Sequence, residues 1–169
     1  MSDLHEAYLN LGSNIEPEIN LVRGIQLLHQ YGNINEISTA WESKSVGSEG
    51  PNFLNICALF VSEHSRIELK KQVIRPIEIE LGRKRNKNKF SPRTIDIDII
   101  LFDGKPTDEK YWELAFVIIP LAEIYPEYRS PITQEKISET AMRFRKEVWM
   151  KARPEVLSLL NGNNFKGQI

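Results

Sequence analysis

The stretch SPRTIDIDIILF, residues 91–102, decides how the rest of this chain is interpreted. In an extended strand successive side chains point to opposite faces, so Ile95, Ile97 and Ile99 share one face while Asp96 and Asp98 share the other. Two unpaired carboxylates side by side on a buried strand are costly, and a roughly 7 Å separation of their Cα atoms suits one hard divalent cation or two neighbouring ones. An amphipathic strand with one solvated face is the alternative.

A basic segment leads directly into this strand. Residues 82–93, GRKRNKNKFSPR, carry six cationic side chains: Arg83, Lys84, Arg85, Lys87, Lys89 and Arg93. Such a run is usually a solvated loop, but cations for phosphate oxygens beside carboxylates for Mg²⁺ are the two halves of a nucleotide-phosphate site. Because the chain has neither a Walker A loop nor a GxGxxG motif, side chains would have to hold the phosphates.

Length and composition are those of a single globular domain. The chain has 169 residues, 41% of them hydrophobic and 27% charged. A net charge of −1 provides no overall attraction to nucleic acid or membrane. The lone cysteine, Cys57, lies in the apolar run FLNICALFV and reads as a buried thiol. Without a signal-peptide pattern or a segment of transmembrane length, we expect a cytoplasmic protein.

Hydrophobic periodicity predicts a β-α-β-β-α-β order followed by further helices. The expected elements are strand 7–12, a helix from Pro17 to Gly32, strands 34–43 and 53–61, a helix from Ser65 to Gly82 kinked at Pro76, strand 95–102, a helical turn from Pro120, and helices within 134–147 and 153–162. The inward positions of the first two helices are Ile19, Val22, Ile25 and Leu28, then Ile67, Val73, Ile74, Ile77 and Leu81. This order predicts an α+β, ferredoxin-like fold with an antiparallel sheet.

Four segments together resemble one enzyme family. LGSN (11–14), PNFLN (51–55), IEIELGRKR (77–85) and above all SPRTIDIDIILFDG (91–104) are similar to 6-hydroxymethyl-7,8-dihydropterin pyrophosphokinase, HPPK, over about residues 7–142. The resemblance implies a ferredoxin-like core with added helices in an α/β/α sandwich. It also implies transfer of pyrophosphate from ATP to the hydroxymethyl group of a dihydropterin, with release of AMP, in folate biosynthesis.

The resemblance also implies roles for individual residues. Asp96 and Asp98 would bind two Mg²⁺ ions and, with Arg83 and Arg93, form the catalytic set. ATP would contact Glu78, Arg83, Arg85, Phe90, Arg93, Ile99 and Lys110. The pterin would contact Ser43, Lys44, Val46, Phe53, Asn55, Asp96 and Phe116. From the residues alone, core packing is the simpler reading for Phe53 and Phe116, whereas an amide in an apolar strand, Asn55, needs a partner.

Two segments depart from the family pattern. Members commonly carry a VPH segment and a following arginine after the DxD strand, but residues 106–120, PTDEKYWELAFVIIP, contain neither. Either Lys110 substitutes or the nucleotide is held less tightly. Residues 42–48, ESKSVGS, replace a Thr-Pro-Pro-like loop whose prolines would stiffen the wall of the pterin pocket.

The resemblance ends before the tail of the chain. We therefore expect a pyrophosphokinase domain at 1–142 and a helical extension at 143–169. In the extension, Trp149, Val156, Leu157 and Leu160 suggest a helix that packs on the domain or on a second copy, giving a monomer or a homodimer.

Two other functions stay open at this point. A paralogue with weak activity or a related hydroxymethyl substrate is suggested by the missing histidine. A ferredoxin-like RNA-binding module would use the basic loop, but the carboxylate pair would repel an RNA backbone and the strands lack paired exposed aromatics. We expect ATP and a hydroxymethyl-dihydropterin as partners, and neither nucleic acid nor membrane.

Overall fold

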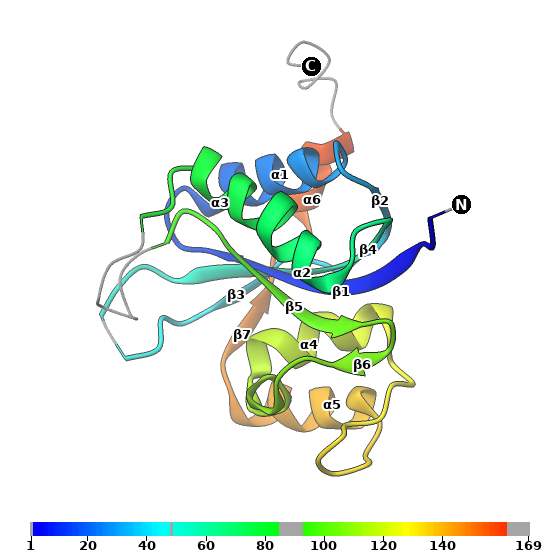
Figure 1. The fold of residues 1–169 in the computed structure, drawn as a ribbon. Coiled ribbons are helices and arrows are strands. Elements are labelled where there is room, and N and C mark those ends of the chain that lie inside the picture. Colours follow the sequence, from blue (N-terminus) through cyan, green and yellow to red (C-terminus); the bar gives the residue numbers. More distant parts are fainter. Residues whose placement is uncertain (1, 48, 85–92, 162–169) are drawn as a thin grey trace.

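The computed structural model describes residues 2–47, 49–84 and 93–161. An antiparallel sheet of seven strands runs through its middle in the order β6-β5-β1-β4-β3-β7, with β2 paired to the outer part of β4 (Figure 1). The strands are β1 His5–Ser13, β2 Asn33–Ile37, β3 Trp41–Ser43, β4 Phe53–Ser62, β5 Asp96–Phe102, β6 Lys105–Pro106 and β7 Met150–Ala152.

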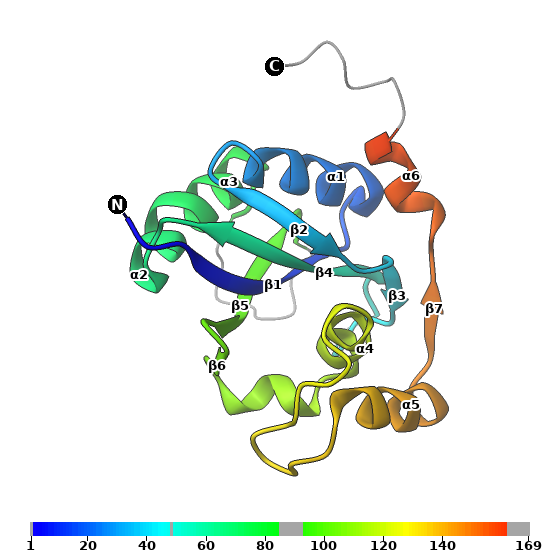
Figure 2. The ribbon, with the colours of Figure 1, turned by 90° about the vertical axis from the view of Figure 1, so that its right-hand side faces the viewer.

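Helices cover both faces of this sheet (Figure 2). One face carries α1 Pro17–Leu28, α2 Arg66–Glu68, the π-helical η1 Leu69–Ile74, α3 Arg75–Glu80 and α6 Glu155–Asn161. The other carries the 3₁₀ helix η2 Glu109–Glu113, α4 Ala115–Ile124 and α5 Ile137–Glu147. The predicted α+β class and antiparallel sheet are therefore confirmed, and the first two helical segments lie on one face.

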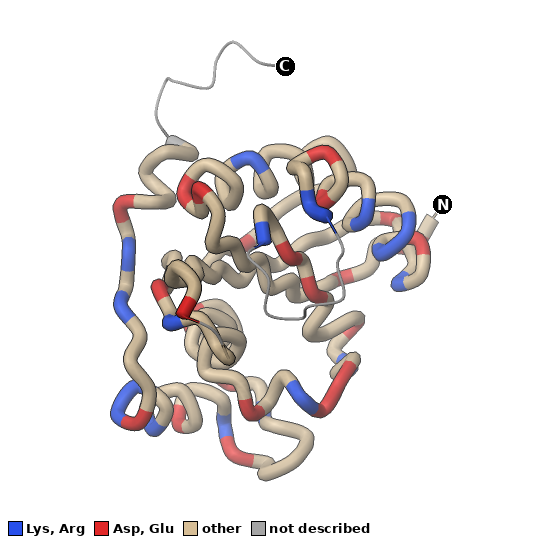
Figure 3. Tube along the Cα trace, turned by 90° about the vertical axis from the view of Figure 1, so that its left-hand side faces the viewer, with Lys and Arg blue, Asp and Glu red and all other residues tan. Residues whose placement is uncertain are grey.

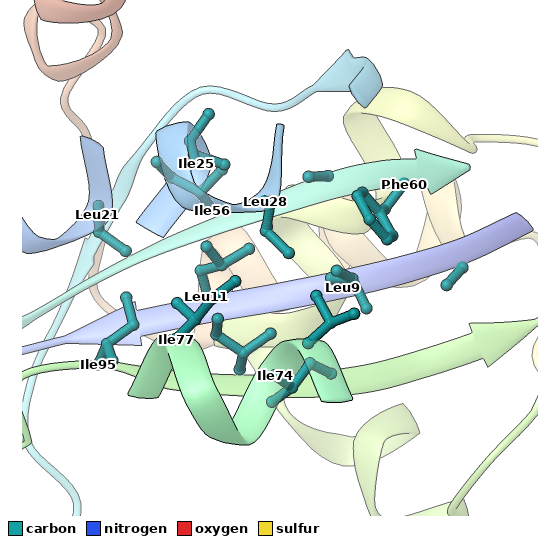
Figure 4. Packing of buried hydrophobic residues seen from close by; sticks show 14 of the residues in the cluster. Leu9, Leu11, Leu21, Ile25, Leu28, Ile56, Phe60, Ile74, Ile77 and Ile95 are labelled. Atoms are coloured by element: carbon teal, nitrogen blue, oxygen red, sulfur yellow. The ribbon is translucent and has the colours of Figure 1, made fainter. Parts of the chain in front are cut away.

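Each face of the sheet has its own hydrophobic cluster. The first lies between β1, β4, β5 and the helices α1 and α3, and Figure 4 shows Leu9, Leu11, Leu28 and Ile74 meeting there. The second lies under α4 and α5 and includes Ile118. Side chains of this size contribute roughly 1.5–3 kcal/mol each when fully buried, so both layers stabilise the sheet.

Strand β1 separates the two clusters by strict alternation. Leu9 and Leu11 enter the first cluster, and Tyr8 enters the second. A register shift between Tyr8 and Leu9 pairs these residues with Leu101 and Ile99, which leaves Ile100 as the extra residue of a β-bulge. Bulges increase local twist and redirect side chains, so β5 presents Ile100 to the second cluster without turning its carboxylates inward.

The second helical segment confirms both its predicted start and its predicted break. Ser65 accepts from the backbone N–H of Glu68 while the Glu68 carboxylate accepts from the N–H of Ser65, a complete capping box. Pro76 lacks an N–H, and the turns before it are π-helical, so the segment divides into α2, η1 and α3. Gly82 follows at φ 84°, a conformation that favours glycine.

Four predictions about helices were wrong. Ile19 and Ile67 are not inward positions, because their side chains are 54% and 64% exposed. Helix α1 ends at Leu28 rather than at Gly32. Pro120 lies inside α4 rather than at its start, because burial of the apolar residues on either side favours one continuous helix over the local preference of proline.

The expected strand 34–43 is two strands. Its middle residue Ser38 exchanges hydrogen bonds with Cys57: the Ser38 N–H donates to the Cys57 carbonyl at 2.8 Å, and the Cys57 N–H donates to Ser38 Oγ at 2.9 Å. The Ser38 side chain thus replaces a backbone carbonyl as the acceptor of one strand–strand hydrogen bond, and β2 and β3 are separate strands. Sequence periodicity does not signal such a substitution because Ser suits strands and turns alike.

The tail contains the predicted helix as α6 and, before it, a strand that periodicity missed. Strand β7 runs from α5 on one side of the sheet to α6 on the other, and pairs with β3 (Figure 2). Arg153 ties the tail down through Glu42 at 2.9 Å, Glu18 at 3.4 Å and Glu155. Val156 is buried in the first cluster. Helix α5 runs across residue 142, and the division of the chain there stays a prediction.

No helix among the described residues has both the length and the apolarity needed to cross a bilayer.

Gly32 packs against β4 at a distance that excludes a side chain. A Cβ at this position would lie 2.5 Å from the Val61 carbonyl oxygen and 2.8 Å from the Phe60 ring. We expect Gly32→Ala to lower the free energy of unfolding by about 1–3 kcal/mol, measured by chemical denaturation. In the control Gly24→Ala, the new Cβ meets only side-chain ends at 3.3 Å or more, and helix propensity improves. Equal stabilities of the two variants would contradict this packing.

Candidate active site

A cavity of about 420 Å³ opens between the second face of the sheet and the start of α4. This volume is within the usual range for a small-molecule site. Its lining brings together most of the residues implied by the family resemblance: Ser43, Lys44, Val46, Phe53, Asn55, Arg83, Arg93, Asp96, Asp98, Lys110 and Phe116. Asn10, Gly12, Ser45, Tyr111 and Leu114 complete it.

Two cross-strand rows of the sheet underlie this cavity, and all their members except the fully buried Cys57 line its floor. In the first row Gly12 of β1 is paired with Asn55 of β4 and with Asp96 of β5. In the second row Asn10 is paired with Cys57 and with Asp98. Because directly paired residues of an antiparallel sheet share a face, the two aspartates and the two asparagines all point to the cavity side.

Hydrogen bonds from its amide nitrogen to residues of β3 hold the Asn55 side chain in place. Its Nδ2 donates to Ser43 Oγ at 2.9 Å and to the Trp41 carbonyl at 3.3 Å. A Cβ on Gly12 would lie 3.2 Å from Asn55 Oδ1, so the glycine keeps space open around that oxygen. The amide is therefore oriented by β3, and its oxygen is left for the cavity.

Asp96 is surrounded by two of the predicted arginines. Arg83 Nη1 lies 2.8 Å from Asp96 Oδ1, and Arg93 Nη1 lies 2.5 Å from Asp96 Oδ2. Arg93 is placed in turn by the LGSN turn, since its N–H donates to Asn14 Oδ1 at 2.7 Å and its carbonyl accepts from the Asn14 N–H at 3.1 Å. The sequence marks Asn14 as part of a turn, but only the fold brings that turn to Arg93.

Glu78 lies beneath this cluster and does not line the cavity. Only 4% of its surface is exposed. Its carboxylate lies 2.5 Å from Arg83 Nη1 and accepts from the backbone N–H of Ile97 at 3.1 Å. Burial raises the pKa of the Glu78 carboxyl, an effect that the Ile97 N–H and then Arg83 oppose. Glu78 therefore positions Arg83 through an ion pair. The predicted contact between Glu78 and ATP stays a prediction.

Asp98 is the most perturbed acid of the floor. Burial, followed by the negative charge of Asp96, raises its pKa to about 6, while Lys110 and Lys70 oppose the shift. Neighbouring Tyr111 also has a raised pKa, chiefly through burial and next through the charge of Asp98. A carboxylate this poorly solvated favours any cation that enters the cavity.

The two aspartates fit the metal that the resemblance implies. Among the described residues no group of three or more acidic, His or Cys side chains surrounds one point. Mg²⁺ does not need such a group, because one or two carboxylates with substrate phosphates and waters complete its octahedron. Asp96 and Asp98 lie on one face of β5 and line one cavity, which is the arrangement that such binding requires.

A second cavity adjoins the first along the edge of β5. It shares Asp98, Lys110 and Tyr111 with the first cavity and contains Ile99, which the first does not. Its wall from α2 to α3 is basic, with Arg66, Lys70, Lys71 and Arg75. Lys110 thus lies between the two cavities, where its ammonium group is 3.4 Å from Asp108 Oδ2 and 5.1 Å from the centre of the Tyr111 ring.

The loop that forms one wall of the first cavity is tied at its base. Glu42 accepts from Asn52 Nδ2 at 2.9 Å and from Arg153 Nη1 at 2.9 Å, so both ends of the loop and the tail meet at one carboxylate. The bond from Asn52, with help from Arg153, lowers the pKa of Glu42. The Lys44 ammonium group lies 5.7 Å from the ring centre of Trp149, a second link from the loop to the tail.

Two implied site residues, Arg85 and Phe90, lie outside the described residues. Sequence reasoning missed Asn10 and Tyr111 as lining residues. An asparagine in the apolar run AYLNLG was a usable signal, whereas nothing local distinguishes Tyr111. The expected site is thus assembled from four strands, one 3₁₀ helix and the start of α4.

Removal of the Asp98 charge should stabilise the metal-free protein in a pH-dependent way. The folded-state pKa of about 6 exceeds the ordinary value of 3.8, so the folded state binds more protons between these values and loses stability as the pH rises through them. We expect Asp98→Asn to match the wild type near pH 4 and to exceed it at pH 7, by at most about 3 kcal/mol.

Thermal unfolding in a chelator from pH 4 to pH 8 measures this difference. Asp103→Asn is the control, because bonds from the Glu6 N–H and His5 lower the Asp103 pKa, and its effect on stability should have the opposite sign. A constant difference for Asp98→Asn across the pH range would show that the carboxylate is not perturbed.

Comparison with known proteins identifies the family. The family model described as 7,8-dihydro-6-hydroxymethylpterin-pyrophosphokinase (HPPK) matches residues 8–126. The 2-amino-4-hydroxy-6-hydroxymethyldihydropteridine pyrophosphokinase of Aquifex aeolicus is 34% identical over 155 residues, covering 81% of this chain and 94% of that protein. The enzyme of the same name from Bacillus subtilis is 32% identical over 153 residues, covering 83% of this chain and 90% of that protein.

Solved structures agree with the fold. A Plasmodium falciparum HPPK-DHPS triple mutant superposes with a TM-score of 0.68 at 12% identity, covering 87% of this chain and 44% of that one. The wild-type Plasmodium falciparum HPPK-DHPS with pteroate has a TM-score of 0.65 at 11% identity, covering 98% and 45%. This chain therefore spans under half the length of those proteins, and at this identity they show the fold alone. From the family model and the curated relatives, the chain belongs to the 7,8-dihydro-6-hydroxymethylpterin-pyrophosphokinase family.

Proposed function

We propose that the protein transfers pyrophosphate from ATP to the hydroxymethyl group of 6-hydroxymethyl-7,8-dihydropterin, with release of AMP, in folate biosynthesis. Family membership and relatives named for this pyrophosphokinase activity support the proposal. The observation that carries it is the single cavity in which an oriented amide and two phenylalanines adjoin a cluster of two aspartates and two arginines. The first set suits a flat heterocycle, and the second suits phosphates.

The heterocycle half of the cavity is formed by β3, β4 and α4. Asn55 presents its amide oxygen while its nitrogen is held by Ser43, and the half-buried rings of Phe53 and Phe116 line the space beside it. An aromatic pair around an amide is the arrangement that a flat, hydrogen-bonding ring needs. Ser43, Lys44 and Val46 would form the rim of the same half.

The phosphate half depends on charge exchange at Asp96. Without ligand, this carboxylate shares its single negative charge between Arg83 and Arg93. A bound triphosphate would take over both guanidinium groups as bidentate donors, and Asp96 would then be free for a cation. Glu78 keeps Arg83 in place throughout, because its bond to the Ile97 N–H is independent of the ligand.

Asp96 and Asp98 would hold Mg²⁺, as two ions. When bound, the metal supplies charge neutralisation on the phosphates and lines up the attacking and leaving oxygens. The chain's own contribution is to position the two substrates for in-line attack. In the step itself the hydroxymethyl oxygen forms a bond to the β-phosphorus, and the bond from that phosphorus to the bridging oxygen breaks. AMP leaves with the bridging oxygen, and the hydroxyl proton passes to solvent water. Arg83 and Arg93 offset the phosphate charge during this step.

The adjoining basic cavity would take the nucleoside end of ATP. Ile99 lines it from the edge of β5, and Lys110 reaches both cavities. We propose that Lys110 supplies the cation that other members provide with the histidine and arginine absent here. Arg85 and Phe90 would complete the ATP site from the basic loop.

The setting of the protein is also a proposal. We infer a cytoplasmic enzyme with a pyrophosphokinase domain at 1–142 and an extension at 143–169, acting as a monomer or a homodimer. Among the described residues, Lys and Arg are interspersed with Asp and Glu along the tube in Figure 3. Together with the net charge of −1, this favours small-molecule substrates over a nucleic acid.

An assay of AMP formation tests the function. We expect AMP from ATP and Mg²⁺ only when 6-hydroxymethyl-7,8-dihydropterin is present. Asp96→Asn and Asp98→Asn should each lower kcat by several orders of magnitude. The melting temperature should stay equal or rise for Asp98→Asn, whose carboxylate is destabilised by burial and by the charge of Asp96, and should fall for Asp96→Asn, which also loses the ion pairs to Arg83 and Arg93. Asp103→Asn, outside both cavities, should leave kcat unchanged. Fully active but destabilised aspartate variants, or RNA binding that is salt-sensitive and indifferent to Mg²⁺, would contradict the proposal.

Replacement of Asn55 by Leu should abolish pterin binding and leave Mg²⁺·ATP binding nearly intact. An unpaired ring edge in a closed pocket costs roughly 1–3 kcal/mol for each lost partner. Calorimetric titration of the pterin into protein saturated with Mg²⁺ and a non-hydrolysable ATP analogue measures the effect. Asn33→Leu is the control, because Asn33 lies on β2 and lines neither cavity, so pterin affinity should not change. Unchanged pterin affinity in a folded Asn55→Leu variant would misplace the pocket.

A further inference from the structure

Asn10 is a buried residue whose amide oxygen has no hydrogen-bond partner within the described part of the chain. Its side chain is 4% exposed, it lines the first cavity, and no described residue hydrogen-bonds its Oδ1. Most buried polar atoms in folded proteins are hydrogen-bonded, and an unsatisfied one costs about 1–3 kcal/mol. The unpaired acceptor therefore lowers the stability of the ligand-free protein, and a ligand that donates a hydrogen bond to it would remove this penalty.

The neighbours of Asn10 explain why the protein does not satisfy it. Across the sheet it is paired with Cys57 on one side and with Asp98 on the other. The Asp98 carboxylate is an acceptor, and the Cys57 thiol is only a weak donor. Across the sheet, therefore, neither neighbour of Asn10 in this row offers its Oδ1 a strong donor.

The two rows together define which ligand edge would fit. Asn55 Oδ1 belongs to the first row, and Asn10 Oδ1 belongs to the adjacent row, two residues along β1 from Gly12. A ring lying along the floor would meet both oxygens with one edge. Such an edge must carry N–H or O–H donors at more than one place, as a dihydropterin does.

If Asn10 had only a structural role, its amide would be expected to hydrogen-bond within the protein. An amide kept for the fold would bond a neighbouring strand or loop, as Asn14 does with Arg93 and Asn20 does with the Ile15 carbonyl at 2.6 Å. Asn10 makes no such bond among the described residues. A water held there in the absence of ligand would be displaced by a donor on the ring.

We propose that Asn10 is a specificity-determining residue of the pterin pocket, whose Oδ1 accepts a hydrogen bond from an N–H or O–H group on the edge of the bound ring. This inference rests on the proposed function. It assigns to β1 a direct part in substrate recognition, in addition to the spacing role of Gly12.

Two variants with opposite steric effects test this role. Asn10→Val fills the site with an apolar side chain suited to a strand, and Asn10→Ala empties it. Both remove the acceptor, so both should weaken pterin binding by about tenfold or more. Pterin is titrated calorimetrically into protein saturated with Mg²⁺ and a non-hydrolysable ATP analogue. Affinity for that analogue should change less than twofold, and the melting temperature of Asn10→Val should be equal to or above that of the wild type.

Cys57→Ala is the matched control, because Cys57 belongs to the same row and is fully buried. It should lower the melting temperature and leave pterin affinity unchanged. Unchanged pterin affinity in both Asn10 variants would overturn the inference. So would a loss of affinity in Asn10→Val alone, which would show steric blockage, or a matching loss for the ATP analogue. If the wild type itself fails to bind the pterin, the proposed function fails instead, and the two failures are distinguishable.

Discussion

The register of β1 between β4 and β5 is the constraint on which the rest of this structure depends. In one register, Leu9 and Leu11 are buried against α1 and α3, and Gly12 comes to lie between Asn55 and Asp96. A slip of one residue would turn every β1 side chain to the other face, exposing the leucines to the cavity and burying Asn10 in the apolar cluster. Burial of the core and assembly of the site are therefore consequences of the same pairing.

Most charged side chains of the described site form ion pairs with one another in the absence of a ligand. Asp96 is matched by Arg83 and Arg93, and Glu78 holds Arg83 from below. Only Asp98, with its raised pKa, is left without a close cationic partner among the described ion pairs. Phosphates and a cation can enter such a site by exchanging partners, which costs less than bringing isolated charges out of water.

The loop that forms one wall of the first cavity is held in place by contacts with the tail of the chain. Strand β7 pairs with β3, whose last residue is Ser43, and Arg153 reaches the Glu42 carboxylate that also binds Asn52. The loop between β3 and β4 lacks the prolines that would stiffen it. Its base is instead fixed by strand pairing and by one shared carboxylate, so the tail has a structural connection to the substrate pocket that the resemblance to the family did not indicate.

The sequence by itself determined the α+β class, the capping box at Ser65, the break near Pro76 and the shared face of Asp96 and Asp98, because each depends on residues within a few positions of one another. Only the tertiary structure decided that Glu78 supports Arg83, that Asn10 Oδ1 meets no donor among the described residues, that Gly32 excludes a side chain and that β7 pairs with β3 at the edge of the sheet. Each of these depends on atoms that the chain brings together from distant positions, and no local periodicity encodes such a distance. The same physical difference explains why Ile19 and Ile67 were wrongly placed inside: periodicity gives a helix face, but the packing of neighbouring elements decides where that face ends.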